Sequence, residues 1–297
     1  MLRGKGGAMR VAFLGMGRMG VAMAAHVLDA GHDLAVWNRT PGKAGPLVER
    51  GATEAGSARE AVAGADAVVL MLFGPDAVRE VLPEVLEGAA EGTLVVDSST
   101  IGPQAAREFG AACAERGVRY VDAPVAGSTG PAREGTLGVL AGASPADYEN
   151  ARPLLELWGA LEKVRHTGEV GSGSAMKLCV NQGLAVQAAG VGESLRLGRD
   201  LGVDRDALLD VLGSGAYGWF LAQKRSMLDA ADYSGTTFSL ELMSKDLDLA
   251  LAAADTDLAV TAACLTQARR AQDAGHSGED YAAIAGHLAD EGEADSY

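Results

Sequence analysis

Three glycines near the start of the chain, Gly15, Gly17 and Gly20, have the spacing G-x-G-x-x-G within the stretch FLGMGRMG. Glycine makes up 40 of the 297 residues, so the spacing alone is a weak signal. Its context is stronger, because it follows a strand-like apolar run, RVAFLG, and opens a helix-like segment at residues 18–30. In such a turn the first glycine permits a tight bend, the second lets the backbone approach a pyrophosphate, and the third allows close helix–strand packing. The stretch predicts a dinucleotide-binding turn, whose expected contacts are Gly15, Met16, Gly17, Arg18, Met19 and Gly20.

The first half of the chain continues to alternate strand-like and helix-like segments. Further strands are expected at residues 33–38, 66–72, 93–100, 118–125 and 136–143, and amphipathic helical stretches separate the earlier ones. Strands that alternate with helices of this length form right-handed βαβ crossovers. The pattern therefore predicts a parallel sheet with covering helices.

After about Gly173 the strand pattern stops. Residues 174–201 lack proline and are rich in Ala, Leu, Val and Gly, which predicts one long, largely buried helix. Gly202 is the expected end of this helix, and Asp204 the cap of the next one. The glycines inside the long helix are expected to permit close packing of neighbouring helices; they are Gly183, Gly190 and Gly198.

The composition limits the partners of the chain. A formal net charge of −15 argues against nucleic acid, so an anionic ligand must meet a local cluster of positive groups. The apolar run at residues 67–73 is too short to cross a bilayer, and the basic start is no signal peptide. Cys113, Cys179 and Cys264 are expected to be reduced. We expect a cytoplasmic protein with a frayed amino-terminal tail of about eight residues and a disordered acidic tail at residues 290–297.

The end of the second expected strand bears on which dinucleotide is bound. NAD sites usually carry Asp or Glu there for the ribose 2′-hydroxyl, whereas this chain reads WNRTPGK and has no carboxylate until Glu49. Asn38, Arg39, Thr40 and Lys43 occupy this turn, and two cations can bind a 2′-phosphate. The alternative is a solvated basic turn. The turn favours NADP over NAD.

Most chemical signatures that could define a reaction are absent. The chain has no Tyr-x-x-x-Lys pair, no P-loop and no convincing zinc spacing, so no metal is expected. Its five histidines are dispersed, and surface or capping roles are expected for them. In GSGSAMKLCVNQ, however, Lys177 and Asn181 are four residues apart and share one helix face. Lys177 is either a functional inward-facing ammonium or a lysine whose head extends to solvent.

Taken together, the motifs resemble the β-hydroxyacid dehydrogenase family, which includes 3-hydroxyisobutyrate dehydrogenases and NADPH-dependent glyoxylate and succinic semialdehyde reductases. The matching stretches follow the family order over nearly the whole chain: GMGRMG, NRTPGK, DSST, DAPVAGSTGPAREGTL, GSGSAMKLCVNQ, KDLDLA and GEDYAAI. The resemblance implies an α/β fold with a Rossmann-type doubly wound parallel sheet, followed by an all-α domain. We place the NADP-binding domain at residues 9–170 and the helical substrate and dimerisation domain at residues 171–297. The resemblance also implies an active site in the cleft between the domains.

The resemblance assigns roles to individual residues. It implies that Lys177 is the catalytic acid/base and that Asn181 is its hydrogen-bonding neighbour. The PVAGS loop, with Gly127 and Ser128, would hold a substrate carboxylate. The remaining assignments are Thr100 and Lys245 near the nicotinamide ribose or ring, with Lys245 also near the substrate, and Met71 and Leu72 along the adenosine.

One departure from the family pattern concerns the substrate. The family loop usually reads Pro-Val-Ser-Gly, and Ala126 stands where that serine is expected. A substrate carboxylate would lose one donor there, for which Ser128 or a backbone N–H can compensate.

The implied reaction is reversible hydride transfer between the nicotinamide and the carbonyl carbon of a small aldehyde or keto acid. Two alternatives are an imine reductase of the same superfamily and a non-catalytic NADP-binding protein. The long apolar helix further suggests a homodimer or homotetramer.

Overall fold

The computed structural model describes residues 7–290, and the chain divides into two compact units between Lys177 and Leu178. Both predicted tails fall largely outside the described residues. This division lies seven residues after the expected boundary between residues 170 and 171, and it leaves the first turn of the long helix in the first unit. The reason is that backbone N–H groups of Gly171 and Ser174 bind the side chain of Asp122 in that unit.

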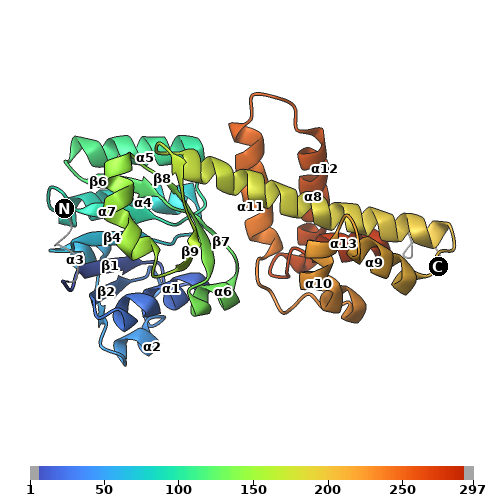
Figure 1. The fold of residues 1–297 in the computed structure, drawn as a ribbon, viewed down its shortest axis with the longest axis horizontal. Helices are drawn as coiled ribbons and strands as arrows, with labels where there is room; N and C mark the ends of the chain where they lie inside the picture. Colours follow the sequence, from blue (N-terminus) through green and yellow to red (C-terminus); the bar gives the residue numbers. More distant parts are fainter. Residues whose placement is uncertain (1–6, 291–297) are drawn as a thin grey trace. The chain divides into compact units, whose positions relative to one another are not determined.

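The first unit contains a nine-stranded sheet in the order β3-β2-β1-β4-β5-β6-β8-β7, with β9 paired to β8 (Figure 1). β1 to β6 pair in parallel, and Phe13 in β1 lies between Val36 in β2 and Val69 in β4. The strands are β1 Arg10–Leu14, β2 Asp33–Trp37, β3 Thr53–Glu54, β4 Ala67–Leu70, β5 Leu94–Asp97, β6 Arg119–Asp122, β7 Val125–Ala126, β8 Leu137–Gly142 and β9 Gly159–Gly168.

The far part of the sheet differs from the predicted all-parallel arrangement. β8 runs antiparallel to β6 and β7, and parallel to β9. The single strand expected at residues 118–125 is two strands, because Pro124 has no N–H to donate to a ladder. The sheet is therefore dominated by parallel pairs but mixed at this end.

Both faces of the sheet are covered, which makes the fold doubly wound. Val11 and Phe13 of β1 face one hydrophobic core, with helices α1 and α7, while Ala12 and Leu14 face a second core, with helices α3, α4 and α5. The four consecutive apolar residues of β1, Val11 to Leu14, are thus explained by burial on two sides. The helices of this unit are α1 Arg18–Asp29, α2 Gly45–Val48, α3 Ala58–Val62, α4 Pro75–Gly88, α5 Pro103–Glu115, α6 Thr129–Glu134 and α7 Pro145–Leu155.

The second unit is helical over its described residues, apart from an isolated bridge between Ser239 and Asp280. Its core is built from α8 and the helices that follow, and contains a buried ion pair between Lys224 and Asp280 at 2.8 Å. The elements are α8 Ser172–Asp200, which begins in the first unit, α9 Arg205–Gly213, α10 Gly218–Ala230, α11 Leu240–Ala253, α12 Ala259–Ala271, a π-helical segment Gln272–His276 and α13 Ala283–Asp290. None of the described helices has the length and apolar character needed to cross a membrane.

The long helix ends as its sequence predicts. Gly202 has φ +70° just past its end, and the side chain of Asp204 accepts a hydrogen bond from the Ala207 N–H at the start of α9. A Cβ at Gly190 would meet Tyr217, and one at Gly198 would meet Leu208, so close packing is confirmed at both. At Gly183 no neighbouring helix of the described chain comes close, because a Cβ there would have no heavy atom within 4 Å beyond its chain neighbours and the backbone of its own helix.

Candidate functional site

The turn between β1 and α1 requires glycine at two of its three positions. Gly15 has φ +106°, and a Cβ on it would overlap the carbonyl oxygen of Met71. A Cβ on Gly20 would overlap the carbonyl oxygen of Gly15. Gly17 is different, since it is exposed and no described heavy atom beyond its chain neighbours lies within 4 Å of the place its Cβ would take. The turn therefore leaves open space beside Gly17, at the amino terminus of α1, where a phosphate can approach the backbone.

The residues around this turn differ in how they are held by the protein. Met16 is buried and its N–H donates to Asn38 Oδ1 at 2.8 Å, while Asn38 Nδ2 donates to the Thr40 carbonyl at 2.8 Å. Asn38 thereby connects the glycine turn to the end of β2. Arg18 is exposed, whereas Met19 is half-buried and packs against the core.

The basic turn after β2 lies at the surface. Arg39, Thr40 and Lys43 are exposed. Arg39 lies 3.7 Å from Glu80, but both side chains are largely exposed, and ion pairs of that kind contribute little. The turn thus presents cations that an anion can recruit. The neighbouring Glu80 was not anticipated, because it comes from α4.

The carboxyl ends of β1, β4 and β5 meet beside the glycine turn. Met71 donates its N–H to the Leu14 carbonyl, and Leu72 donates its N–H to Ser99 Oγ at 2.9 Å. Thr100 follows directly in the chain. The structure thus gathers the glycine turn, Met71, Leu72 and Thr100 at one edge of the sheet. Ligands of doubly wound folds bind at this kind of edge.

Two buried side chains, those of Asp97 in β5 and Tyr120 in β6, are hydrogen-bonded to each other. Asp97, at the end of β5, accepts hydrogen bonds from the Ser99 N–H at 2.9 Å and the Tyr120 hydroxyl at 3.0 Å. Burial raises the pKa of Asp97 to about 6, and it also raises the pKa of Tyr120. Sequence reasoning did not single out either residue.

The loop expected to hold a substrate carboxylate follows β6, which ends in a buried carboxylate. Asp122 accepts hydrogen bonds from the N–H groups of Gly171 and Ser174, each at 2.7 Å, and so caps the amino terminus of α8. Burial raises the pKa of Asp122 to about 6 even though these N–H groups favour its charged form. Asp122 therefore fixes the helix that carries Lys177 against the strand that carries the loop. Sequence reasoning missed this role, although a charged residue ending a buried strand needs a partner.

The loop itself offers a short run of polar groups. Gly127 is exposed with φ +132°, and Ser128 is half-buried at the start of α6, with no capping hydrogen bond from its side chain. Ala126 lies in β7 opposite Gly138 of β8. The backbone and the Ser128 hydroxyl are the donors available here, since Ala126 supplies none from its side chain.

On α8, Lys177 is half-buried and Asn181 is almost fully buried. Within the second unit Asn181 donates through Nδ2 to Asp246, and the neighbouring Lys245 donates to the other oxygen of the same carboxylate. Asn181 Oδ1 is buried and has no hydrogen-bond partner in the part of the chain that the structure describes. The structure thus brings Asn181 and Lys245 together through Asp246. That residue was not anticipated, although it adjoins Lys245 in the chain.

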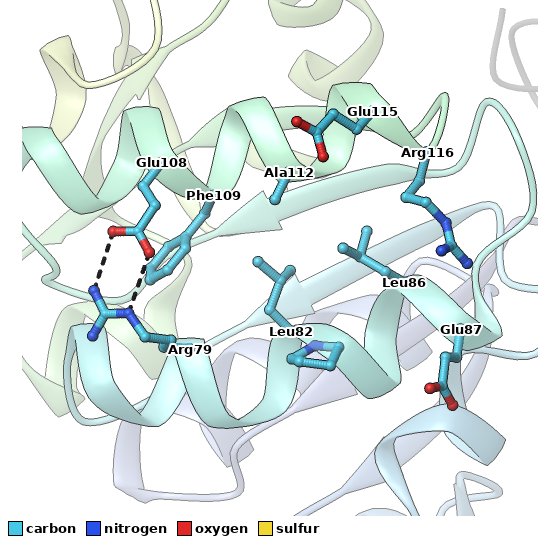
Figure 2. A pocket seen from close by; sticks show the side chains of 10 residues that line it. Arg79, Leu82, Leu86, Glu87, Glu108, Phe109, Ala112, Glu115 and Arg116 are labelled. Atoms are coloured by element: carbon cyan, nitrogen blue, oxygen red, sulfur yellow. Dashed lines mark hydrogen bonds and ion pairs between the residues drawn. The ribbon is translucent and has the colours of Figure 1, made fainter.

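A groove between α4 and α5 takes no part in this arrangement (Figure 2). Leu82 and Leu86 point from α4 towards α5, which contributes Phe109 and Ala112, and Arg79 pairs with Glu108 at 3.2 Å at one end. The other lining residues are Pro83, Glu87, Ala112, Glu115 and Arg116. None of the predicted site residues lines the groove.

Comparison with known proteins covers both units. Residues 10–171 match the family model of the NAD binding domain of 6-phosphogluconate dehydrogenase. Residues 171–288 match that of the NAD-binding domain of NADP-dependent 3-hydroxyisobutyrate dehydrogenase.

Individual relatives agree with these models. An NAD-dependent L-serine dehydrogenase from Pseudomonas aeruginosa is 38% identical over 85% of this chain and 87% of its own. A 3-hydroxyisobutyrate dehydrogenase from the same organism is 36% identical over 92% of this chain and 96% of its own. The solved structure of a Mycobacterium tuberculosis 3-hydroxyisobutyrate dehydrogenase with L-serine matches with a TM-score of 0.86 and 32% identity, covering 95% of this chain and 99% of the other. The chain therefore belongs to the β-hydroxyacid dehydrogenase family of NAD(P)-dependent oxidoreductases.

Proposed function

We propose that this enzyme transfers a hydride between NADP(H) and a small carboxylate that carries an aldehyde, a ketone or the corresponding hydroxyl, with Lys177 as acid/base. The observation that carries the proposal is the capping of α8 by Asp122. It ties Ser174, one helical turn before Lys177, to the strand that leads into the PVAGS loop. A candidate proton donor and a candidate carboxylate-binding loop are thus held by one buried group.

The residues present fit a dinucleotide. Gly17 leaves the backbone accessible where a pyrophosphate would lie, and the exposed Arg39 and Lys43 can neutralise a 2′-phosphate. Bound NADPH would supply the hydride from the nicotinamide ring. One relative is named as NAD-dependent, so membership of the family does not fix which coenzyme is used. We base the proposed preference for NADP on Arg39 and Lys43.

The proton is the part of the reaction that the chain itself supplies. As an ammonium, Lys177 donates a proton to the carbonyl oxygen as negative charge develops there, and in the oxidation direction the neutral amine removes it. Asn181, four residues on, is held by Asp246 and retains a free acceptor, Oδ1, among the described residues. We assign it to orienting the Lys177 ammonium.

The substrate class follows from the loop. Backbone N–H groups at Gly127 and Ser128 and the Ser128 hydroxyl would bind the carboxylate, while Ala126 leaves room where a serine would donate. Relatives are named after L-serine and 3-hydroxyisobutyrate. In both compounds a single carbon separates the carboxylate from the CH2OH group. We propose substrates of this 3-hydroxy acid type and the semialdehydes formed from them.

The experiment that tests the proposal is steady-state kinetics with NADP(H) and NAD(H) in parallel. The substrates are L-serine, 3-hydroxyisobutyrate, succinic semialdehyde, glyoxylate and a cyclic imine. We expect turnover of a hydroxy acid or semialdehyde with a preference for NADP(H). Lys177→Ala should lower kcat by about 10²- to 10⁴-fold and leave NADPH affinity nearly unchanged. Unaltered kcat in this variant would refute the lysine mechanism, and turnover of the imine alone would refute the substrate class.

A further inference from the structure

A compact cluster in the second unit consists of His276, Glu279 and His287. These residues follow all the residues proposed for hydride transfer along the chain. His276 ends the π-helical segment, Glu279 lies in the following turn, and His287 lies on α13. One potential ligand atom from each residue lies within 4.8 Å of those of the other two. The imidazole rings have centroids 4.3 Å apart and are tilted by 41°. The sequence predicts only dispersed histidines, since His276 and His287 are eleven positions apart.

Hydrogen bonding satisfies only part of this cluster. His276 Nδ1 and Glu279 Oε1 are 2.8 Å apart, a hydrogen-bond distance. Glu279 Oε2 and His287 Nε2 are both buried and have no hydrogen-bond partner among the described residues. They lie 3.6 Å apart, which is too long for a hydrogen bond. Two buried polar atoms without partners carry a desolvation cost that a shared ligand would remove.

We propose that His276, Glu279 and His287 bind a divalent transition-metal ion, with Zn²⁺ as the best match. Two imidazoles and a carboxylate are ligands that Zn²⁺ accepts, whereas Mg²⁺ and Ca²⁺ prefer oxygen alone. Zn–N bonds of about 2.0–2.1 Å in a tetrahedral site put ligand atoms ~3.4 Å apart. The 3.6 Å separation of Glu279 Oε2 and His287 Nε2 is close to that spacing. Water would take the fourth position.

The ion would cross-link two segments of the second unit. Glu279 directly precedes Asp280, whose carboxylate is bound by Lys224 Nζ at 2.9 Å and by the Thr237 N–H at 2.9 Å. Coordination would join the turn that carries this buried ion pair to the carboxyl-terminal helix. Because the unfolded chain does not hold the three ligands together, binding would stabilise the folded protein.

The test is Zn²⁺ titration by calorimetry on tag-free protein stripped with a chelator, with Mg²⁺ as the control ion. We expect one Zn²⁺ per chain, a rise in Tm with Zn²⁺ and no effect of Mg²⁺. His287→Gln and Glu279→Gln should each weaken Zn²⁺ binding by more than about 100-fold, since losing even an outer-shell partner of a metal ligand costs about 10- to 100-fold. Asp273→Asn, an exposed carboxylate in the same segment, should bind like the unmodified chain.

Two controls keep the result interpretable. Circular dichroism of each variant without metal establishes that it is folded, and His276→Gln provides a third ligand variant if another is unstable. Co²⁺ in place of Zn²⁺ reports coordination through its visible absorption. Absence of stoichiometric Zn²⁺ binding, or binding that survives all three ligand substitutions, would overturn the proposal.

Discussion

Gly17 and Gly20 stand three positions apart in one turn, yet the structure restricts them in different ways. No described heavy atom beyond its chain neighbours lies within 4 Å of a Cβ at Gly17, whereas a Cβ at Gly20 would overlap the carbonyl oxygen of Gly15. Gly17→Ala should therefore leave the free energy of unfolding almost unchanged while weakening NADPH binding by about tenfold or more, equivalent to about 1.4 kcal/mol. Fluorescence titration with NADPH measures this loss.

Gly20→Ala is the matched comparison. Its methyl group meets backbone within the protein itself, so we expect a loss of about 1–3 kcal/mol in the free energy of unfolding without coenzyme. Urea denaturation of both variants provides the test. Equal stability of the two variants would contradict the packing role given to Gly20.

The buried carboxylate of Asp97 predicts a specific pH dependence. Burial raises its pKa from 3.8 to about 6, so between these values the folded protein binds the proton more tightly than the unfolded chain. The stability that this provides is full below pH 3.8 and is lost as pH rises through 6. Between about pH 5 and pH 7.5 the loss amounts to about 1.4 kcal/mol.

Asp97→Asn removes this titration and can still bond to Ser99 and Tyr120. Its free energy of unfolding should fall less than that of the unmodified protein over the same pH interval, as followed by urea denaturation at several pH values. Asp122, whose pKa is also raised to about 6, titrates in both proteins, so the pH dependence of the variant is reduced and not abolished. Parallel pH profiles would show that Asp97 does not titrate in this range.

Among the elements, α8 depends on a residue about fifty positions before it in the chain. We assign Asp122 as a positioning residue, because its carboxylate binds the N–H groups of Gly171 and Ser174 and so sets the start of the helix.

Asp122→Ala should lower the free energy of unfolding by about 2 kcal/mol, the upper end of the range for a lost helix cap. It should also lower kcat more than it raises the KM for substrate, because Lys177 would lose its fixed place. Asp122→Asn keeps one acceptor and should recover part of kcat. Equal losses in both variants would point to a requirement for charge and not for position.

The elements that the sequence predicted are those whose burial is strong and local. β1, β2, β4 and β5 read as nearly continuous apolar runs because both faces of each strand are covered. β9 was missed, since half of its residues are exposed, including the charged Glu162, Lys163 and Arg165, and Leu161 is 69% exposed. β3 was missed because it has only two residues, at Thr53–Glu54.

The same distinction applies to the candidate site. The glycine turn was predictable because its three glycines lie within six residues, between a strand-like run and a helix-like segment. The capping by Asp122, the bridging by Asp246 and the meeting of His276 with His287 depend on segments that are brought together by tertiary structure. No local pattern encodes such meetings. The spacing His-x-x-Glu at residues 276–279 brings two of the three proposed metal ligands together, but nothing in it points to His287.

At the scale of the whole molecule, we propose that the enzyme forms a homodimer or homotetramer. Leu197 near the end of α8 and Leu201 just after it are 60% and 70% exposed, and Val203, two residues further on, is also exposed. Monomeric proteins seldom leave such apolar groups together at the surface. Replacing both leucines with glutamate should shift the mass found by light scattering towards the monomer. Leu161→Glu, equally exposed but in the first unit, is the control and should leave the mass unchanged. A monomeric unmodified protein would contradict the proposal.

The strand order of the sheet has a consequence for folding during synthesis on the ribosome. Gly15 leaves the ribosome well before Met71, on whose carbonyl it packs, and β1 acquires its second neighbour only when β4 has been made. Pairings so distant along the chain form slowly, whereas the helices of the second unit rely more on nearby contacts. A nascent chain thus carries the glycine turn long before it can retain a nucleotide. The coenzyme can therefore stabilise only chains whose central sheet is already assembled, and it cannot act as a template for the earliest steps of folding.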